Sequence, residues 1–557
     1  MSTGALVTRV YADFRGVDFR GEDINLRRSP DSLNMWRNYK NIASIETRPG
    51  MALLEGFTAP VYGIFFYKDK LLVHSGDKLY AVAGGAKDVI FEGICESVSD
   101  GFVYEDIWYF KDGRQYLRYD GSTIGPVVGY VPTTSIGRKP AGGGSTHEDV
   151  NMLSSRRINT FLADGISFDF HLDAQNIDGD FKPIVKVDGE VIDGYTVDYA
   201  KGVIRIVKAP DAPLTAGQDN VSIEFSKTVE AYRLAIEKCR LLQVFDNRVF
   251  FSGNAEHPNT VWHCSLNDPS YVSDLDYYRE GMDSAQIRGL VAGNNALWVF
   301  REPSAANTNV FYHTPTIDDE YGKIYPSSHS SVTTGCVGKA INFNDDIVFF
   351  SARGMEGISG DITTEQVVAH RSSLVDRKLT GEAGYRDMVL AEWEGYLLVF
   401  IGRKVYLADS RTAFTNEDHI EYDWYYWEME KAITCAEVKE GILYLGTEDG
   451  VYTLTDFSCQ VTSYWVTPKD KFQYPQKLKT TNKRGCVAEA RGDIAVYAKL
   501  EDTDFELIGK YEKVTDYFVS RIKRKKWKDI QLKFMSQTRF SLESISLEAW
   551  IGGYIKR

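Results

Sequence analysis

The stretch MVLAEWEGYLLVFIGRKVYLAD, residues 388–409, decides the fold of this chain. It runs as an alternating strand, the two-residue turn Glu394-Gly395, a strongly apolar strand, a second turn and a third alternating strand. β-branched and aromatic residues suit pleated strands, and glycine and short polar residues tolerate the left-handed backbone of a tight turn. A hairpin of this kind cannot bury its own apolar face, so it requires neighbours built in the same way.

The same pattern recurs on both sides of this stretch. Further copies begin at Gly63, Phe102, Leu241, Gly289, Ala340 and Thr434. From Leu241 onward the copies start 48, 51, 48 and 46 residues apart, which fits four-stranded propeller blades of roughly 40–50 residues. Radially packed sheets leave few exposed edges. The sequence therefore predicts an all-β fold, a β-propeller of about seven blades; the alternative is a series of unrelated hairpins in sandwiches.

The regular spacing breaks once and then stops near the C-terminus. The copies at Phe102 and Leu241 lie 139 residues apart, and the excess holds short alternating strands between Asp-Gly and Lys-Gly turns. A short helical pattern follows over 229–242. We expect an N-terminal arm with the first propeller blades over 1–140 and an inserted β-sandwich over 141–230. The remaining blades are expected over 231–465 and a C-terminal β-sandwich over 466–557.

Composition excludes several classes of protein. Lys and Arg number 64 against 78 Asp and Glu, a net charge of -14, whereas a protein whose main task is to grip nucleic acid carries a basic excess. The start of the chain shows no secretory signal, and no apolar run approaches the ~20 residues of a membrane-spanning helix. Seven scattered cysteines, without a CxxC pair, are expected to be buried in a reducing cytoplasm.

No catalytic signature is visible in the sequence. GxSxG, HExxH and P-loop motifs do not occur, so we expect no enzyme activity, no catalytic residue, no cofactor and no metal. His257 and His263 are interpreted as turn and surface residues. Acidic loops are interpreted as solvated turns, with bound Ca²⁺ as the alternative at 176–180, which lacks the later glutamate of a calcium loop. These loops contain Asp274, Asp276 and Asp283, and Asp318, Asp319 and Glu320.

One basic run stands out in this acidic chain, and Trp527 lies inside it. The run consists of Arg521, Lys523, Arg524, Lys525, Lys526 and Lys528. One interpretation is contact with nucleic-acid phosphates or an acidic partner, with Trp527 as a stacking residue. The other is an edge strand guarded by lysines, because Ile522 and Trp527 alternate with the charges. The run is our first choice for a charged interface.

Several stretches together resemble one family, the propeller-bearing tail proteins of tailed bacteriophages, known as nozzle or tail-hub proteins in short-tailed phages. They are SPDSLNM at 29–35, TRPG at 47–50, FFSGN at 250–254 with PN at 258–259, WH at 262–263, SLNDPSY at 265–271, RRINTF at 156–161 and GGY at 552–554. None of these motifs is catalytic in the family.

The resemblance implies a structural protein of the virion tail. Copies are then expected to form a ring, a homohexamer, around the channel through which genomic double-stranded DNA is ejected. The expected partners are further copies, adjacent tail and portal-adaptor proteins, tail fibres, and DNA that passes without specific contacts. Assembly is expected in the host bacterial cytoplasm. An acidic channel wall would let DNA slide. A loop over 302–330 is a candidate gate for the channel.

Two other functions compete with the tail protein. The first is a carbohydrate-binding or carbohydrate-active propeller on the host surface, which predicts a carboxylate pair beside a Tyr or Arg cluster at the propeller mouth. The second is an intracellular scaffold for protein partners, which predicts a monomer. Fold alone does not separate the three.

Overall fold

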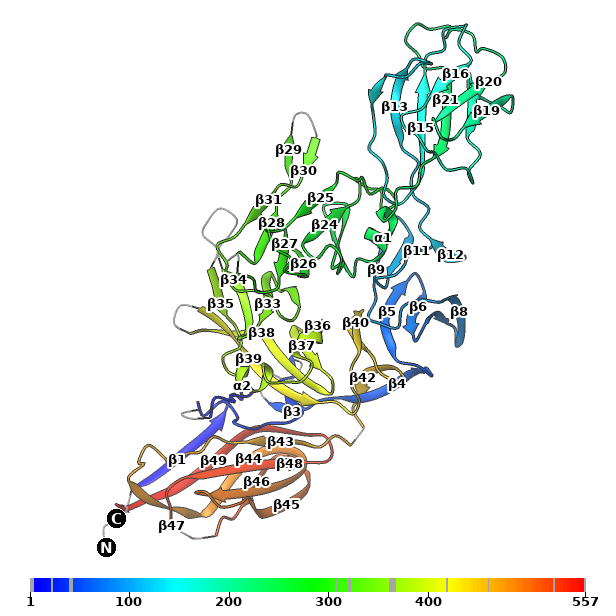
Figure 1. Cartoon of the computed structure of the whole chain (residues 1–557). Helices are drawn as coiled ribbons and strands as arrows, with labels where there is room; N and C mark the ends of the chain where they lie inside the picture. Colours follow the sequence, from blue (N-terminus) through cyan, green and yellow to red (C-terminus); the bar gives the residue numbers. More distant parts are fainter. Residues whose placement is uncertain are drawn as a thin grey trace. The chain divides into compact units, whose positions relative to one another are not determined.

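The computed structural model (Figure 1) describes the chain except residues 1–4, 22–23, 40–43, 306–307, 319–321, 360–366, 417–418, 459, 524–525 and 555–557. Strands make up nearly all of its regular structure. In this described part the helical segments are α1 (Tyr232–Glu237), α2 (Asp376–Leu379) and one 3-10 turn (Tyr385–Asp387). The all-β prediction is confirmed, and α1 lies inside the predicted helical stretch at 229–242.

Each predicted repeat forms an antiparallel four-stranded sheet, which we number 1 to 7 along the chain. Sheets 1 and 2 contain β5 (Val61–Tyr67), β6 (Lys70–Ser75), β7 (Lys78–Ala83) and β8 (Ala86–Glu92), then β9 (Asp100–Tyr104), β10 (Ile107–Lys111), β11 (Tyr116–Tyr119) and β12 (Ile124–Pro126). Sheets 3 and 4 contain β22 (Leu241–Phe245), β23 (Arg248–Ser252), β24 (Thr260–His263) and β25 (Tyr277–Arg279), then β26 (Ile287–Gly293), β27 (Ala296–Arg301), β28 (Val310–His313) and β31 (Ser327–His329).

The remaining repeats follow the same order. Sheets 5 and 6 contain β32 (Ala340–Phe343), β33 (Asp346–Ser351), β34 (Gly354–Ser359) and β35 (Val367–His370), then β36 (Val389–Trp393), β37 (Tyr396–Ile401), β38 (Lys404–Asn416) and β39 (His419–Glu428). Sheet 7 contains β40 (Cys435–Lys439), β41 (Ile442–Gly446), β42 (Gly450–Asp456) and β4 (Gly50–Gly56).

The turns between the first two strands of each sheet explain why these sequences form hairpins. Asp246 and Asn247 have φ of 49° and 56°, and Asn294 and Asn295 have φ of 51° and 58°. Paired positive φ values match the twist of a two-residue hairpin, and Asn and Asp tolerate them better than other non-glycine residues.

The chain divides into two compact units, residues 1–88 with 330–557 and residues 89–329. In the first unit consecutive sheets pack together, because strands of sheets 5 and 6, 6 and 7, and 7 and 1 are in contact. In the second unit sheet 3 packs between sheets 2 and 4. The contacts between sheets 6 and 7, 7 and 1, 2 and 3, and 3 and 4 join their first strands, so these strands form the crowded inner edge of each set.

Sheet 7 joins the two ends of the repeat array. Its fourth strand, β4, comes from the N-terminal part of the chain and pairs antiparallel with β42, for example Ala52 with Thr453. The next strand along the chain, β5, already belongs to sheet 1, which shares a buried cluster with sheet 7 that includes Val61, Val73 and Val451. The start and the end of the repeat array are therefore fastened together.

The insertion consists of two sheets around one core, whose members include Phe161, Phe170, Ile204 and Ile223. The six-stranded sheet contains β14 (Ser145–Thr146), β13 (Thr133–Arg138), β15 (Arg156–Phe161), β21 (Val221–Ser226), β17 (Ile184–Val187) and β18 (Glu190–Ile192), and the three-stranded sheet contains β16 (Asp169–His171), β20 (Val203–Ile206) and β19 (Tyr195–Asp198). β13 begins before the boundary predicted at 141, because it pairs in parallel with β15.

The C-terminal strands form one ten-stranded sheet together with the N-terminal arm, and we call this set the C-terminal module. Its strands are β1 (Leu6–Ala12), β2 (Met35–Trp36), β3 (Ile45–Thr47), β43 (Ser463–Val466), β44 (Lys477–Leu500), β45 (Glu506–Val514), β46 (Tyr517–Ser520), β47 (Lys526–Trp527), β48 (Ile530–Ser536) and β49 (Phe540–Tyr554). β1 runs antiparallel to β49. The predicted segment 1–140 is therefore divided, since its arm belongs to the C-terminal module.

The candidate gate at 302–330 contains regular structure. It holds β28, the hairpin of β29 (Thr316–Asp318) and β30 (Gly322–Ile324), and β31. The sequence suggested a long loop here because the β29–β30 hairpin separates β28 from β31, the last two strands of sheet 4. In the described residues no helix is long and apolar enough to cross a membrane.

Candidate interaction surface

The basic run forms one margin of the C-terminal module. Arg521 and Lys523 precede β47, Lys526 begins it and Lys528 follows it, whereas Arg524 and Lys525 lie outside the described residues. The four described cations are exposed, while Ile522 and Trp527 are buried. β47 pairs with β44 through Thr480 and Lys526. The alternation is that of a half-buried strand.

Trp527 belongs to the core of the module. Its indole is fully buried, and Nε1 donates a hydrogen bond of 3.1 Å to Oγ1 of Thr481. Its ring meets Phe472 edge-on, with 5.5 Å between the ring centroids. A side chain held in this way cannot stack on a base, so the interpretation of Trp527 as a stacking residue is wrong.

The exposed cations border a pocket of about 310 Å³, which we call the basic pocket. Arg521, Lys523 and Lys526 contribute positive charge to it. The apolar part of the lining includes Leu500, Leu507, Ile508, Ile522 and Trp527, and Glu501 and Glu506 add two carboxylates. The pocket therefore offers both charge and apolar surface.

The four described cations of the run are not neutralised by carboxylates of the described residues. In the part of the chain that the structure describes, Arg521, Lys523, Lys526 and Lys528 form no ion pair with an acidic side chain. A carboxylate contact is made here by the backbone, since the Lys528 N–H donates to Oε1 of Glu501 at 3.0 Å. Unpaired cations of this kind remain available to an outside partner.

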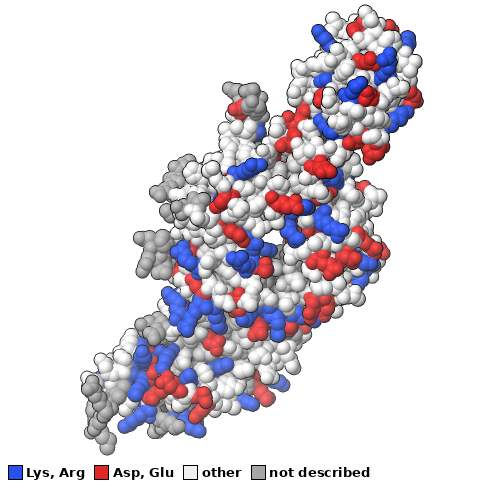
Figure 2. Space-filling model, in the orientation of Figure 1, with Lys and Arg blue, Asp and Glu red and all other residues white. Residues whose placement is uncertain are grey.

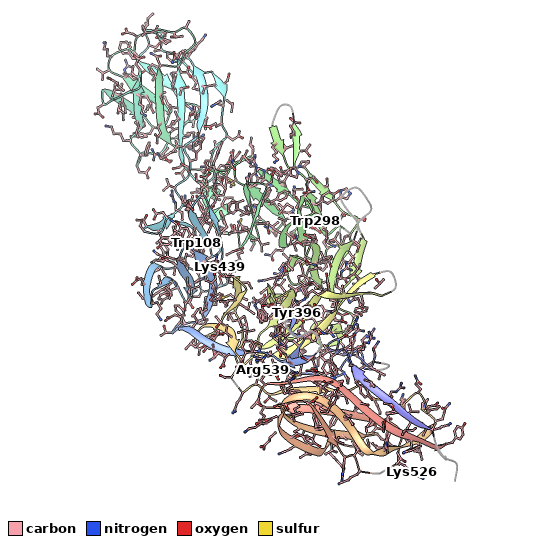
Figure 3. The ribbon with its side chains drawn as sticks, turned by 180° about the vertical axis from the view of Figure 1, so that it is seen from behind. Trp108, Trp298, Tyr396, Lys439, Lys526 and Arg539 are labelled. Atoms are coloured by element: carbon pink, nitrogen blue, oxygen red, sulfur yellow. The ribbon has the colours of Figure 1, made fainter. Side chains whose placement is uncertain are left out.

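Charge is strongly segregated along the chain. Residues 463–557 contain 20 Lys and Arg against 12 Asp and Glu, and residues 1–462 contain 44 against 66. The C-terminal segment therefore carries +8 and the remainder -22. In Figure 2 blue side chains lie together with red ones over the C-terminal module on the face shown, and in Figure 3 Lys526 and Arg539 lie toward opposite ends of the module.

The motif residues at 29–35 and 47–50 hold the N-terminal arm in place. The Asn34 amide donates to the Thr462 carbonyl at 2.9 Å, and its Oδ1 accepts from Arg48 Nε at 3.0 Å and from the Glu428 N–H at 2.8 Å. Ser29 donates to the Val466 carbonyl at 2.7 Å. These residues join the arm, sheet 6 and β43, so their role is architectural.

The motif residues at 250–271 shape the loops of sheet 3. The Asn254 amide donates to the Ala235 carbonyl at 2.9 Å and ties the sheet to α1. The Asn259 amide donates to the Gly281 carbonyl at 3.1 Å. Asp268 Oδ1 accepts from the Ser270 N–H at 2.9 Å and from its hydroxyl at 2.7 Å, which stabilises a tight turn. These contacts give the three side chains a structural role in the loops of sheet 3.

Two residues weighed as metal ligands, His263 and Asp178, make hydrogen bonds within the protein. The prediction that His263 lies at the surface is wrong: it is buried within β24, and burial lowers its pKa to about 4. Asp178 Oδ2, in the segment 176–180, accepts hydrogen bonds from Ser226 and Thr228. Among the described residues no group of three His, Cys, Asp or Glu side chains could hold a metal. Asp319 and Glu320 lie outside those residues.

The cysteines behave mostly as buried apolar groups. Burial raises the pKa of Cys239, Cys264, Cys435 and Cys486 to about 12. Cys336 is also buried and Cys95 is half-buried, while Cys459 falls outside the described part of the chain.

A charged cluster at sheet 5 was not found from the sequence. His370 Nε2 lies 2.5 Å from Asp376 Oδ2, and its Nδ1 lies 3.3 Å from Glu356 Oε2. Burial lowers the pKa of His370, but hydrogen bonds and charge from the two carboxylates outweigh it and raise that pKa to about 9. The sequence separation of the three residues gives no metal-like or catalytic spacing that could have revealed them.

A second cluster brings carboxylates together with Arg and Tyr at sheets 5 and 6. Asp346 Oδ2 accepts from Arg371 Nε at 2.8 Å and from the Tyr422 hydroxyl at 2.7 Å. Glu392, on the first strand of sheet 6, is exposed, and its pKa is raised by partial burial and by the charge of Asp345. The contact of Asp346 with Arg371 and Tyr422 supplies one part of what the carbohydrate hypothesis predicts, a carboxylate beside Arg and Tyr.

Comparison with known proteins identifies no family. No family model matches the chain, and no curated protein matches it. Among solved structures, BamB from Moraxella catarrhalis is similar over 72% of this chain and 96% of its own, with 11% identity and a TM-score of 0.33. The Pan2 WD40 domain of Neurospora crassa is similar over 74% of this chain and 96% of its own length, with 9% identity and a TM-score of 0.26. Scores this low carry no argument about function.

Proposed function

We propose that the seven sheets close into one seven-bladed propeller. Three features support this arrangement. Six of the sheets are four-stranded meanders in chain order, and the seventh is completed by β4. Four of the five contacts between neighbouring sheets, all but that of sheets 5 and 6, bring first strands together, as at the narrow axis of a propeller. Finally, β4 completes the last sheet beside the first, which is how a ring of sheets is fastened.

The chain then acts as a structural subunit of a viral tail, a nozzle or tail-hub protein. The observation that carries this proposal is the segregation of charge: residues 463–557 carry +8, with unpaired cations beside a pocket, and the remainder of the chain carries -22. Such a chain can bind the next copy by placing a positively charged surface of one copy against a negatively charged surface of the other. Head-to-tail contacts of this kind close into a ring if the rotation allows.

The proposed ring comprises six copies around the DNA-ejection channel. Its acidic remainder would repel phosphates, so genomic DNA would pass without being held. Adjacent tail and portal-adaptor proteins, and tail fibres, are the proposed neighbours of the ring. The proposed location is the virion tail, after assembly in the cytoplasm of the bacterial host.

Immunoelectron microscopy of virus particles tests this function. Antibodies against the inserted domain, residues 133–226, are expected to label the tail of particles purified from lysed host cultures. Intact particles that contain no label and no peptides of this chain by mass spectrometry would contradict the proposal.

The contact of Asp346 with Arg371 and Tyr422 favours a second function, a carbohydrate-active propeller. Glycosidases act through a pair of carboxylates, and the candidate pair is Asp345 with Glu392, whose pKa is raised by partial burial and by the charge of Asp345. The test is release of reducing ends from host surface polysaccharide, compared between the natural chain and Glu392→Gln. Turnover that is lost in the variant supports this second function, and absence of turnover with the natural chain removes it.

A further inference from the structure

We infer that the basic pocket is the docking site for a second copy of this chain, and that the outer edge of sheet 3 is the surface which enters it. This inference rests on the proposed ring and deepens it by naming the two surfaces that meet.

The pocket is built to receive an acidic surface that also carries apolar side chains. Arg521, Lys523 and Lys526 have no carboxylate partner among the described residues, and they border a lining that includes Leu507, whose side chain is 49% exposed, and Ile508. Isolated cations gain by pairing across an interface, and apolar surface gains by leaving water.

A nucleic-acid strand fits this pocket poorly. Glu501 and Glu506 also line it, and two carboxylates would repel the phosphates that supply most of the affinity for DNA. Trp527, the aromatic residue of the basic run, is fully buried and is not available for stacking. A protein surface with mixed charge and exposed apolar groups matches the lining better.

The chain itself carries such a surface on β25 and its flanking turns, which we call the acidic rim. Leu275 is 68% exposed, Tyr277 is 40% exposed and Met282 is fully exposed. Their acidic neighbours are Asp274, Asp276 and Asp283. Exposed apolar side chains gathered at a sheet edge mark interaction surfaces.

Carboxylates predominate among the charged groups of the rim. Asp274 accepts a hydrogen bond from the Tyr232 hydroxyl at 2.9 Å, and Asp283 pairs with Arg301. The Asp276 carboxyl is desolvated, and its pKa is raised to about 6 by burial. Arg279, over the Tyr277 ring, is the nearby cation on β25. The rim therefore has the opposite charge balance to the basic pocket.

The pocket and the rim are different surfaces of one chain, so the contact is heterologous. Each copy offers its pocket to one neighbour and its rim to the other. A ring built in this way needs no two-fold symmetric patch.

Zero-length carbodiimide cross-linking between two isotopically distinguishable copies of the full chain tests the inference. The natural chain is expected to give intermolecular peptides that join 521–528 to 274–283. Lys523→Glu with Lys526→Glu in the pocket, or Leu275→Lys with Met282→Lys at the rim, is expected to weaken self-association about tenfold in analytical ultracentrifugation, because each change places like charges opposite each other. Sedimentation is the readout for these variants because Lys→Glu also removes the amines that carbodiimide couples. All four positions are exposed, so folding should be retained, as circular dichroism will verify.

Mixing the two double variants is the decisive arm, because reversed charges then face each other again. The mixture is expected to regain association in sedimentation. Lys186→Glu with Lys208→Glu, two exposed positions on the inserted domain, is the matched control and is expected to change nothing.

Two results overturn the inference and are distinguishable from failure of the proposed function. If copies with the charge-reversed pocket associate as well as the natural chain, the pocket is not the docking site, but the proposed ring is unaffected. Absence of any intermolecular cross-link also refutes the pocket, while labelling of virion tails by antibody decides the tail function separately.

Discussion

Replacement of Asn34 by alanine should loosen the joint between the N-terminal arm, sheet 6 and β43. The side chain is buried and forms three hydrogen bonds, to Thr462, Arg48 and the Glu428 backbone. At about 1 kcal/mol each they contribute about 3 kcal/mol. Asn34 also has φ of 57°, a left-handed conformation that costs alanine roughly 1 kcal/mol more.

The sum, about 4 kcal/mol, corresponds to roughly a thousandfold rise in local opening. Hydrogen exchange followed by mass spectrometry on peptides 424–430 and 461–466 measures it. Asn34→Gly is the matched control, since glycine adopts positive φ freely and should lose only the hydrogen bonds. If Asn34→Ala leaves exchange within about threefold of the natural chain in both peptides, the assignment of this residue as the joint is refuted.

Three further perturbations concern buried contacts. Trp527→Ala should lower the free energy of unfolding of the C-terminal module by about 3–5 kcal/mol, measured as a lower thermal unfolding temperature. An unchanged unfolding temperature together with weaker DNA binding would contradict the placement of Trp527 in the core. The pKa of His370 is raised to about 9, so its ion pairs stabilise sheet 5 fully below pH ~6.5 and lose this effect as the pH rises through 9. Hydrogen exchange of peptides 367–379 should therefore accelerate over that range, but not in His370→Gln. Gly16→Ala would place a Cβ against the backbone carbonyl of Trp424 on β39, so the N-terminal arm should become sensitive to protease. Gly84→Ala is the control, because Gly84 has open space around it and its replacement should not change protease sensitivity. Equal sensitivity of the two variants would argue against the contact of Gly16 with Trp424.

Local patterns were sufficient to predict the repeated sheets. Turn residues such as Asp246-Asn247 adopt the positive φ values expected of hairpins, and the copies at Gly63 to Thr434 each contribute a four-stranded sheet. The burial of Ile522 and Trp527 also follows the alternation visible in the sequence.

Long-range pairing could not be predicted in the same way. An alternating strand such as Leu6–Ala12 specifies which face is apolar but not its partner, and its partner β49 lies at the opposite end of the chain. The same limit hid β4 as the last strand of sheet 7. The burial of His263 was missed because its polar character suggested a turn, whereas its place within β24 buries it among aromatic rings.

The site itself was predictable only in part. The basic run is evident from composition, but the pocket depends on Leu500, Leu507 and Ile508, which β44 and β45 bring to it from other parts of the sequence. The acidic rim was visible as Asp274, Asp276 and Asp283, although nothing in the sequence indicated that Leu275 and Met282 would be exposed beside them.

Cryo-electron microscopy of isolated viral tails tests the central claim of assembly by shape most directly. We expect a ring of copies, each containing one closed wheel of seven four-stranded sheets, with the basic pocket of one copy against sheet 3 of the next. A map in which this chain is a lone subunit away from the channel, or in which sheets 2 to 4 and sheets 5, 6, 7 and 1 form separate arcs, would contradict it.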